Sequence, residues 1–302
     1  MERRNFLAGL GAVGMASCAP LRREDAPPAN VRLTLLHTND THSRIEPFGP
    51  GNGALSGKGG MARRATLVKE LRAQLGNVLL LDAGDVFQGT PYFNQYKGSL
   101  DYKLMSMVGY DAATLGNHDF DNGVEGLLTA MVEAKFPFVN CNLDMKGAPA
   151  LAKRVQPWLV KELPGVRVGI TGVCVDFKGL VAPKNHEGVV WMDPLESLKP
   201  VVKHLREREK VDMVVLLSHL GHDLKGMAWD DLSLAPKLLG VDVIIGGHSH
   251  TFLEEPVRVK HAAGETLVFQ VGFGGVNLGR MDFTVSKGVV KAASGAAVPV
   301  MA

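Results

Sequence analysis

The sequence feature that most constrains the fold is an alternation, starting at Val31, of apolar strand-like runs with helix-like segments. The strand-like runs are apolar at consecutive positions, which means that both faces of each strand are covered by other parts of the protein. They include VRLTLLHTN, NVLLLDAGD, VDMVVLLSH and VDVIIGGHSH. The helix-like segments include MARRATLVKELRAQL, PLESLKPVVKHLREREK and DDLSLAPKLLG. This order predicts an α/β fold in which central β-sheets are flanked by helices.

Two further patterns predict antiparallel strands. Pro164 and Gly165 separate two extended runs and predict a β-hairpin within residues 158–173. After Pro256 the chain continues in three short, Gly-rich, strand-like segments: PVRVKHA, ETLVFQVG and GRMDFTVSKG. These segments predict an antiparallel sheet that closes the domain.

The amino-acid composition limits which kinds of molecule the protein is expected to bind. The chain has 302 residues, 46% of them hydrophobic and 21% charged, which is typical of a globular domain. Lys and Arg number 33 against 31 Asp and Glu, and no block of basic residues follows residue 25, so nucleic acid is not expected to be the main partner.

Cys141 and Cys174 lie in apolar runs, where a buried free thiol is the commoner state and a disulfide is the alternative.

The N-terminus, MERRNFLAGLGAVGMASCAP, differs in kind from the rest. Arg3 and Arg4 precede a short apolar stretch, so residues 1–18 are predicted to be a signal peptide that resembles a twin-arginine export signal. The last residues resemble a lipoprotein processing site in which Cys18 becomes lipidated, with cleavage at a nearby small residue as the alternative. Residues 19–30 are predicted to be a linker and residues 31–302 the folded domain. The protein is therefore expected in the periplasm or cell envelope, touching the membrane only through an N-terminal lipid anchor if Cys18 is processed.

Polar side chains that bind metals follow five of the apolar runs. Each motif alone has a simpler interpretation, as a turn or a helix cap, but five such loops together favour a metal site. The carboxyl ends of strands are where open α/β sheets build their sites. The seven candidate ligands are Asp40, His42, Asp85, Asn117, His219, His248 and His250.

Seven ligands are too many for one ion and would hold two. Asp85, alone in its loop beside Gly84, is the natural bridge because a carboxylate has two oxygens. The spacing in Asp40-Thr-His42, repeated in His248-Ser-His250, is expected to place both side chains on one side of an extended loop. Mixed nitrogen and oxygen ligation suits Zn, Mn, Fe, Co or Ni and does not identify the two divalent ions.

Five motifs, LLHTNDTHSRIEP, LLLDAGDVFQGTP, TLGNHDFDNG, LLSHLGHD and IIGGHSHT, resemble in order and spacing the metallophosphatase domain of the 5′-nucleotidase family. This family lies within the calcineurin-like metallophosphoesterases, and the resemblance extends over residues 31 to about 285. It implies a four-layer fold with the active site at the strand carboxyl ends. It assigns one ion to Asp40, His42, Asp85 and His250, and the other to Asp85, Asn117, His219 and His248.

The same resemblance assigns His118 and Asp121 as a catalytic pair. The carboxylate would orient the imidazole and favour its protonated form. A hydroxide bridging the two ions would attack the phosphoryl group, and His118 would protonate the leaving alkoxide. Asp119 is interpreted as a local capping residue, with partnership to His118 as the alternative.

The implied function is that of a dinuclear, metal-dependent phosphoesterase, 5′-nucleotidase-like, acting on nucleotides or related small phosphoesters. Most family members carry a C-terminal domain that binds the nucleobase, and this sequence is expected to lack it. Specificity would then come from loops such as residues 46–60 or from a partner chain. Two alternatives are a thiosulfohydrolase-like enzyme of sulfur oxidation and a non-catalytic, tethered metal- or nucleotide-binding protein.

Overall fold

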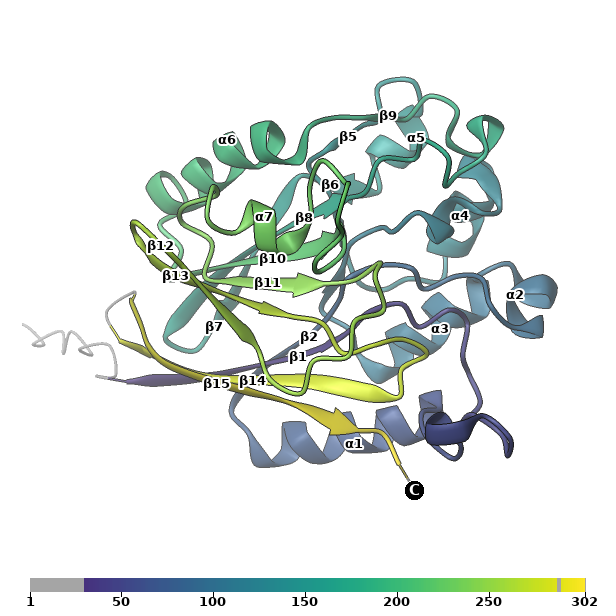
Figure 1. The fold of residues 1–302 in the computed structure, drawn as a ribbon, viewed down its shortest axis with the longest axis horizontal. Helices are drawn as coiled ribbons and strands as arrows, with labels where there is room; N and C mark the ends of the chain where they lie inside the picture. The colour runs from purple at the N-terminus through teal and green to yellow at the C-terminus, as the bar shows by residue number, and fades with distance from the viewer. Residues whose placement is uncertain (1–29, 287–288, 302) are drawn as a thin grey trace, which may run out of the picture.

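A computed structural model describes residues 30–286 and 289–301. The predicted signal peptide, and residues 19–29 of the predicted linker, lie outside the described residues. Two β-sheets pack face to face, and helices cover the outer face of each, with α6 and α7 on one side and α1 on the other (Figure 1). The predicted α/β fold with helix-flanked central sheets is confirmed.

The first sheet has the strand order β15-β14-β1-β2-β3-β4-β6. Its parallel strands are β1 (Val31–Thr38), β2 (Asn77–Asp82), β3 (Ala112–Ala113), β4 (Phe138–Val139) and β6 (Val155–Gln156). Two antiparallel strands complete one edge, β14 (Asn277–Ser286) and β15 (Val289–Pro299).

The second sheet has the strand order β12-β13-β11-β10-β8-β7. Its parallel strands are β13 (Gly264–Phe269), β11 (Val243–Gly246), β10 (Met213–His219) and β8 (Val166–Cys174). The edges are the antiparallel strands β12 (Val257–His261) and β7 (Trp158–Leu163). The predicted hairpin is confirmed, since β7 pairs with β8 across Pro164 and Gly165. A small separate pair joins β5 (Leu143–Asp144) and β9 (Val190–Trp191).

The prediction of one closing antiparallel sheet after Pro256 is wrong. β12 and β13 extend the second sheet, whereas β14 pairs with β1 in the first sheet. Paired with β1, β14 buries Met281, Phe283 and Val285 between the two sheets, and this burial stabilises the observed pairing. β15, whose sequence is mostly Ala, Gly and Val, was not predicted as a strand and pairs along β14.

Consecutive apolar residues in the strands serve different layers. Leu35 in β1 lies between the two sheets, whereas its neighbour Leu36 packs against the helices. In the second sheet Leu217 faces the other sheet and Leu216 faces its helix layer. Each buried Leu stabilises the fold by about 1.5–3 kcal/mol, which explains why these strands carry apolar residues at consecutive positions.

The helices form the two outer layers. The first sheet is covered by α1 (Met61–Gln74), α3 (Ser99–Val108) and α4 (Gly123–Met131), and the second by α6 (Pro194–Glu207) and α7 (Asp231–Leu234). Short helices lie in the connections: α2 (Pro91–Tyr96), α5 (Pro149–Ala152), η1 (Gly53–Leu55), η2 (His118–Phe120) and η3 (Pro183–His186). The helix predicted over residues 230–240 is only four residues long, because Pro236 has no N–H with which to continue it.

Within the described part of the chain, no helix has both the length and the apolar character that crossing a bilayer requires.

Candidate active site

The candidate ligands lie where the carboxyl ends of the two sheets meet. Loops after β1, β2 and β3 supply Asp40, His42, Asp85 and Asn117 from the first sheet. The end of β10 and the loop after β11 supply His219, His248 and His250 from the second. The site therefore lies at the junction of the sheets, on the side toward which β10 and β11 point in Figure 1.

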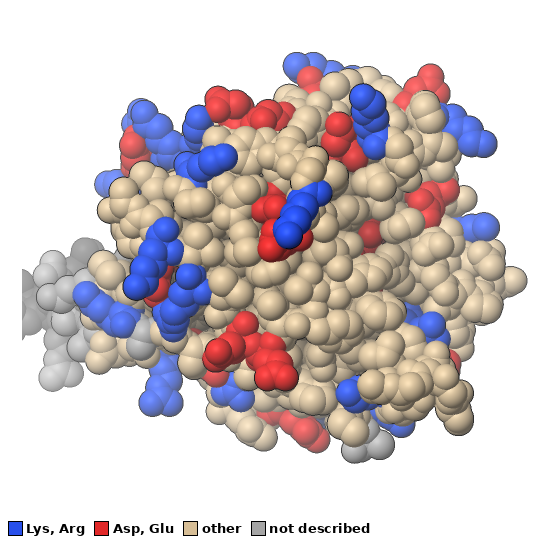
Figure 2. Space-filling model, in the orientation of Figure 1, with Lys and Arg blue, Asp and Glu red and all other residues tan. Residues whose placement is uncertain are grey.

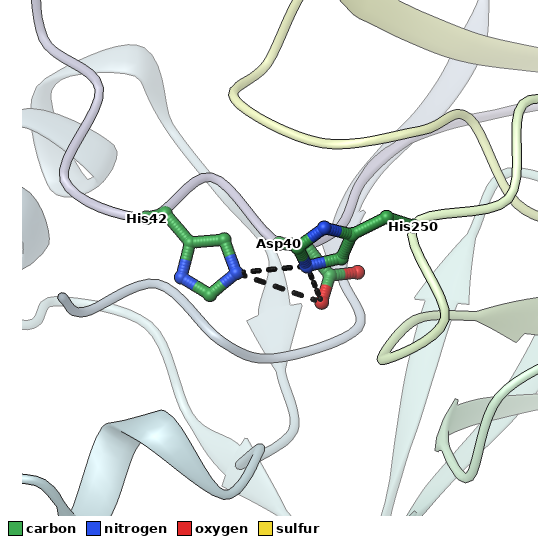
Figure 3. A group of neighbouring side chains, drawn as sticks. All are labelled: Asp40, His42 and His250. Carbon is green, nitrogen blue, oxygen red and sulfur yellow. Dashed lines mark hydrogen bonds and ion pairs between the residues drawn. The ribbon is translucent and has the colours of Figure 1, made fainter. Parts of the chain in front are cut away.

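One group of possible ligand atoms comprises Asp40, His42 and His250, whose atoms all lie within 4.8 Å of one another (Figure 3). The two Nε2 atoms of His42 and His250 are 3.0 Å apart, and Asp40 Oδ1 is 3.3 Å from His250 Nε2. His42 Nδ1 lies 3.0 Å from the Phe87 carbonyl, which can only accept, so this nitrogen carries the proton. Burial lowers the pKa of His42 and so favours the neutral ring. With the proton on Nδ1, the lone pair of the ring is on Nε2, which lies beside His250 Nε2.

The second group comprises Asp85, His219 and His248, again with atoms within 4.8 Å. His219 Nε2 is 3.0 Å from Asp85 Oδ2, while its Nδ1 donates to the Ala83 carbonyl at 2.7 Å. Burial lowers the pKa of His248 to about 4, which leaves a neutral imidazole at neutral pH. The groups adjoin each other, since His219 Nε2 is 3.9 Å from Asp40 Oδ1.

Among the described residues, Asn117 Oδ1 and His219 Nε2 are buried in this region without a hydrogen bond, although His219 Nε2 lies 3.0 Å from the Asp85 carboxylate. Leaving a buried acceptor unpaired costs about 1–3 kcal/mol, so such atoms call for a partner. A cation between them and Asp85 would be that partner. This donor set, of imidazole nitrogens, carboxylate oxygens and one amide oxygen, fits transition-metal ions.

The predicted extended loops are wrong, because the ligand-bearing turns are left-handed. Asp40 and His42 have φ of 49°, and His248 and His250 have φ of 72° and 53°. Asp85, with φ of 54°, shares this conformation, which costs a non-glycine residue roughly 1–2 kcal/mol. Backbone hydrogen bonds offset the strain, including Asp40 N–H to Gly84 O (2.9 Å) and His42 N–H to Asp85 O (3.1 Å).

Three glycines allow His219 to fit between the loops. A Cβ on Gly84 would lie 2.6 Å from the Gly116 nitrogen, and one on Gly116 would lie 2.2 Å from Asp85 Oδ1. A Cβ on Gly247 would lie 2.8 Å from His219 Nδ1. Each of these separations is shorter than real side chains show, so the backbone segments around His219 approach one another only as glycine.

Asp119 ties two of the loops together. Its buried carboxylate accepts backbone N–H groups of Asp85 (3.1 Å) and Gly116 (2.8 Å). The contacts match the interpretation of Asp119 as a local capping residue. His118 is directed instead toward Asp121, with 2.9 Å between Nδ1 and Oδ2.

Sequence reasoning missed Asn39, which holds Asp40 in place. Its side-chain amide donates to Asp40 Oδ2 and to the Gly272 carbonyl, both at 2.6 Å. The only signal in the sequence is a polar residue beside a candidate ligand, which by itself is too common to single out Asn39.

His118 lies beside the two groups without belonging to either. Its ring centroid is 5.4 Å from that of His42, and its backbone N–H donates to Asp85 Oδ1 at 2.7 Å. The hydrogen bond to Asp121 raises the pKa of His118. The imidazole is half-buried and reaches solvent, so it is placed to transfer a proton.

Asp121→Asn is expected to move the alkaline limb of the pH–kcat profile to lower pH. The raised pKa keeps His118 protonated at higher pH than a free imidazole, so activity that needs this proton is lost as pH rises through that pKa. Asn removes the charge that favours the imidazolium, and at alkaline pH turnover should fall, by less than the ~10²–10⁴-fold of a whole acid–base group. The measurement is kcat against pH with a phosphoester of the class that the resemblance implies, and an unmoved limb would contradict the pairing.

The model of the calcineurin-like phosphoesterase family matches residues 33–252 of this sequence. The chain belongs to this family. The 5′-nucleotidase of Homo sapiens is 40% identical over 228 residues, which cover 73% of this chain and 38% of that protein. The trifunctional nucleotide phosphoesterase protein YfkN of Bacillus subtilis (strain 168) is 33% identical over 291 residues, 86% of this chain and 18% of that protein. This chain thus matches less than half the length of either relative.

The solved structures include a 5′-nucleotidase precursor from Thermus thermophilus that superposes with a TM-score of 0.81 at 38% identity. The superposition covers 89% of this chain and 54% of that one. The similarity places the fold described above within the family of metallophosphoesterases.

Proposed function

We propose that this protein is a dinuclear, metal-dependent phosphoesterase, 5′-nucleotidase-like, that hydrolyses nucleotides or related small phosphoesters. The observation that carries the proposal is the pair of adjoining ligand groups, each with its atoms within 4.8 Å, beside the His118–Asp121 pair. The similarity to nucleotidases supports the substrate class, and the family supports the chemistry.

Two sets of residues would hold the ions. One ion would be held by Asp40, His42, Asp85 and His250, and the other by Asp85, Asn117, His219 and His248. Asp85 suits a position shared by both, because its Oδ2 lies 3.0 Å from His219 Nε2, and because each oxygen has two lone pairs, so that Oδ1 can bind an ion while it accepts the backbone N–H of His118. When bound, the ions would supply Lewis acidity and lower the pKa of a water molecule.

Residues of the chain itself would donate the proton, orient the donor and hold the ligand-bearing loops. His118 would donate its Nε2 proton to the leaving oxygen, since its Nδ1 is engaged by Asp121. Asp121 would hold the ring in this orientation and favour its charged form. Asp119 and Asn39 would hold the ligand-bearing loops without touching the substrate.

Export and specificity are part of the proposal. A signal peptide over residues 1–18, with a lipid anchor at Cys18, would place the enzyme in the periplasm or cell envelope. Residues 46–60, or a partner chain, would supply contacts to the rest of the substrate. Figure 2 shows Lys and Arg interspersed with Asp and Glu on the viewed face, so the charges there form no large field of one sign.

The test is phosphate release by the purified protein supplied with Mn, Co or Zn. The substrates are nucleoside monophosphates, nucleotide sugars, cyclic nucleotides and a generic aryl phosphate. Release from at least one of them is expected, and an Asp40→Asn control should abolish it, which excludes a contaminating phosphatase. Cleavage of a thiosulfate conjugate without phosphate release would favour the thiosulfohydrolase alternative. Bound metal with no product would favour a binding protein.

A further inference from the structure

Three phenylalanines form a cluster that begins at the candidate metal site. We call Phe48, Phe252 and Phe273 the aromatic cluster. The ring of Phe273 stacks on the candidate ligand His250, with centroids 5.0 Å apart and an interplanar angle of 17°. Phe48 and Phe252 each lie 6.0 Å from Phe273 and nearly perpendicular to it. The cluster thus continues without a break from the site to the surface.

The cluster is held in place by the glycines on either side of Phe273. A Cβ on Gly272 would lie 2.2 Å from the ring of Phe252, and one on Gly274 would lie 2.7 Å from the ring of Phe48. Both glycines have positive φ, +86° and +63°, which side chains rarely adopt. The backbone of Phe252 is fixed as well, by an isolated β-bridge to Val271. The ring positions therefore exist before any ligand arrives.

The two outer rings differ in their surroundings. Phe48 is 6% exposed, and the guanidinium of Arg44 lies 4.2 Å from the centre of its ring. Phe252 is 48% exposed. A rigid and exposed aromatic ring loses little conformational entropy on binding, which is what a stacking surface requires. Phe252 is thus the most exposed ring of the cluster.

We propose that Phe252, supported by Phe273, binds the planar base of a nucleotide whose phosphate lies at the metal site. The side chain of His250 is 39% exposed, so the ligand group at one end of the aromatic cluster is accessible to solvent, as Phe252 is at the other. Any nucleobase can stack on an aromatic side chain, because every base has a π-face. The substrate class is therefore nucleoside monophosphates in preference to sugar phosphates. This inference rests on the proposed phosphoesterase function.

The kinetic test compares adenosine 5′-phosphate with ribose 5-phosphate. Phe252→Ala should raise KM for the nucleotide by about tenfold or more, leave kcat nearly unchanged, and leave KM for the sugar phosphate unchanged. Phe252→Tyr should restore the wild-type KM because it keeps the ring. The matched control is Leu180→Ala, since Leu180 is 43% exposed and lines a separate apolar hollow with Phe177 and Val190. This variant should change neither KM nor kcat for either substrate.

Two results would overturn the inference. One is an equal effect of Phe252→Ala on both substrates, and the other is discrimination lost in Leu180→Ala instead. A calorimetric titration of adenosine into wild type and Phe252→Ala separates this inference from the proposed function, because it needs no turnover. If the protein releases no phosphate but binds adenosine through Phe252, the proposed function fails and the stacking surface stands. If adenosine binds both proteins alike while phosphate is released, the proposed function stands and the stacking surface on Phe252 is wrong.

Discussion

Asp85→Ala is expected to lose turnover by more than ~10²-fold and to bind substoichiometric metal. Removing a group that only supports a ligand already costs ~10–100-fold, and Asp85 is proposed as a ligand to both ions. Burial opposes ionisation of Asp85, but the imidazole of His219, 3.0 Å away, outweighs it and holds the pKa of this carboxyl below its usual range. A carboxylate is therefore present at neutral pH. The measurements are metal content per chain and kcat with the best substrate of the panel.

The control for this variant is Asp144→Ala. Asp144 pairs with Lys146 on the surface at 3.0 Å and touches no candidate ligand. It should retain both metal content and turnover. Retention of two ions per chain in Asp85→Ala would show that this carboxylate bridges nothing.

His118→Ala is expected to keep its metal and to lose turnover of adenosine 5′-phosphate by ~10²–10⁴-fold. The imidazole lies outside both ligand groups, so the ions should remain. The loss should be smaller with an aryl phosphate whose phenol is acidic, because that leaving group departs without a proton. The measurements are kcat for both esters and metal content per chain.

His204→Ala serves as the matched histidine control. His204 lies on α6, beside Glu209 and with its ring 4.6 Å from that of Trp158 at an interplanar angle of 45°. Its replacement should leave both esters and the metal content unchanged. Loss of metal together with activity in His118→Ala would make His118 a ligand instead of an acid.

The sequence predicts the layers of the fold better than the pairing of its strands. Runs that are mostly apolar at consecutive positions, such as β1 and β10, require cover on both faces, and that requirement predicts further layers on each side of a sheet. Which strand joins which sheet depends on contacts between distant segments. β14 follows β13 in sequence yet pairs with β1, and nothing local in its alternation identifies that partner.

The candidate ligands were predictable because strand ends can be read from the sequence, but their geometry was not. The left-handed turns at Asp40 and Asp85 are imposed by hydrogen bonds between separate loops, such as Asp40 N–H to Gly84 O. Local spacing favours an extended loop and carries no record of those bonds. The support from Asp119 likewise depends on two loops meeting in space, and a capping interpretation from one segment captures only part of it.

The position of the site between the sheets has a mechanical consequence. Each ligand group draws side chains from both sheets, with Asp40 and His42 facing His250, and Asp85 facing His219. A bound ion would act as a cross-link that fastens one half of the sandwich to the other. At a free metal concentration 100 times Kd, one such ion would raise the free energy of unfolding by about 2.7 kcal/mol. Chelation should therefore open this end of the sandwich first, and proteolysis in the presence and absence of chelator would reveal it as earlier cleavage in the ligand-bearing loops.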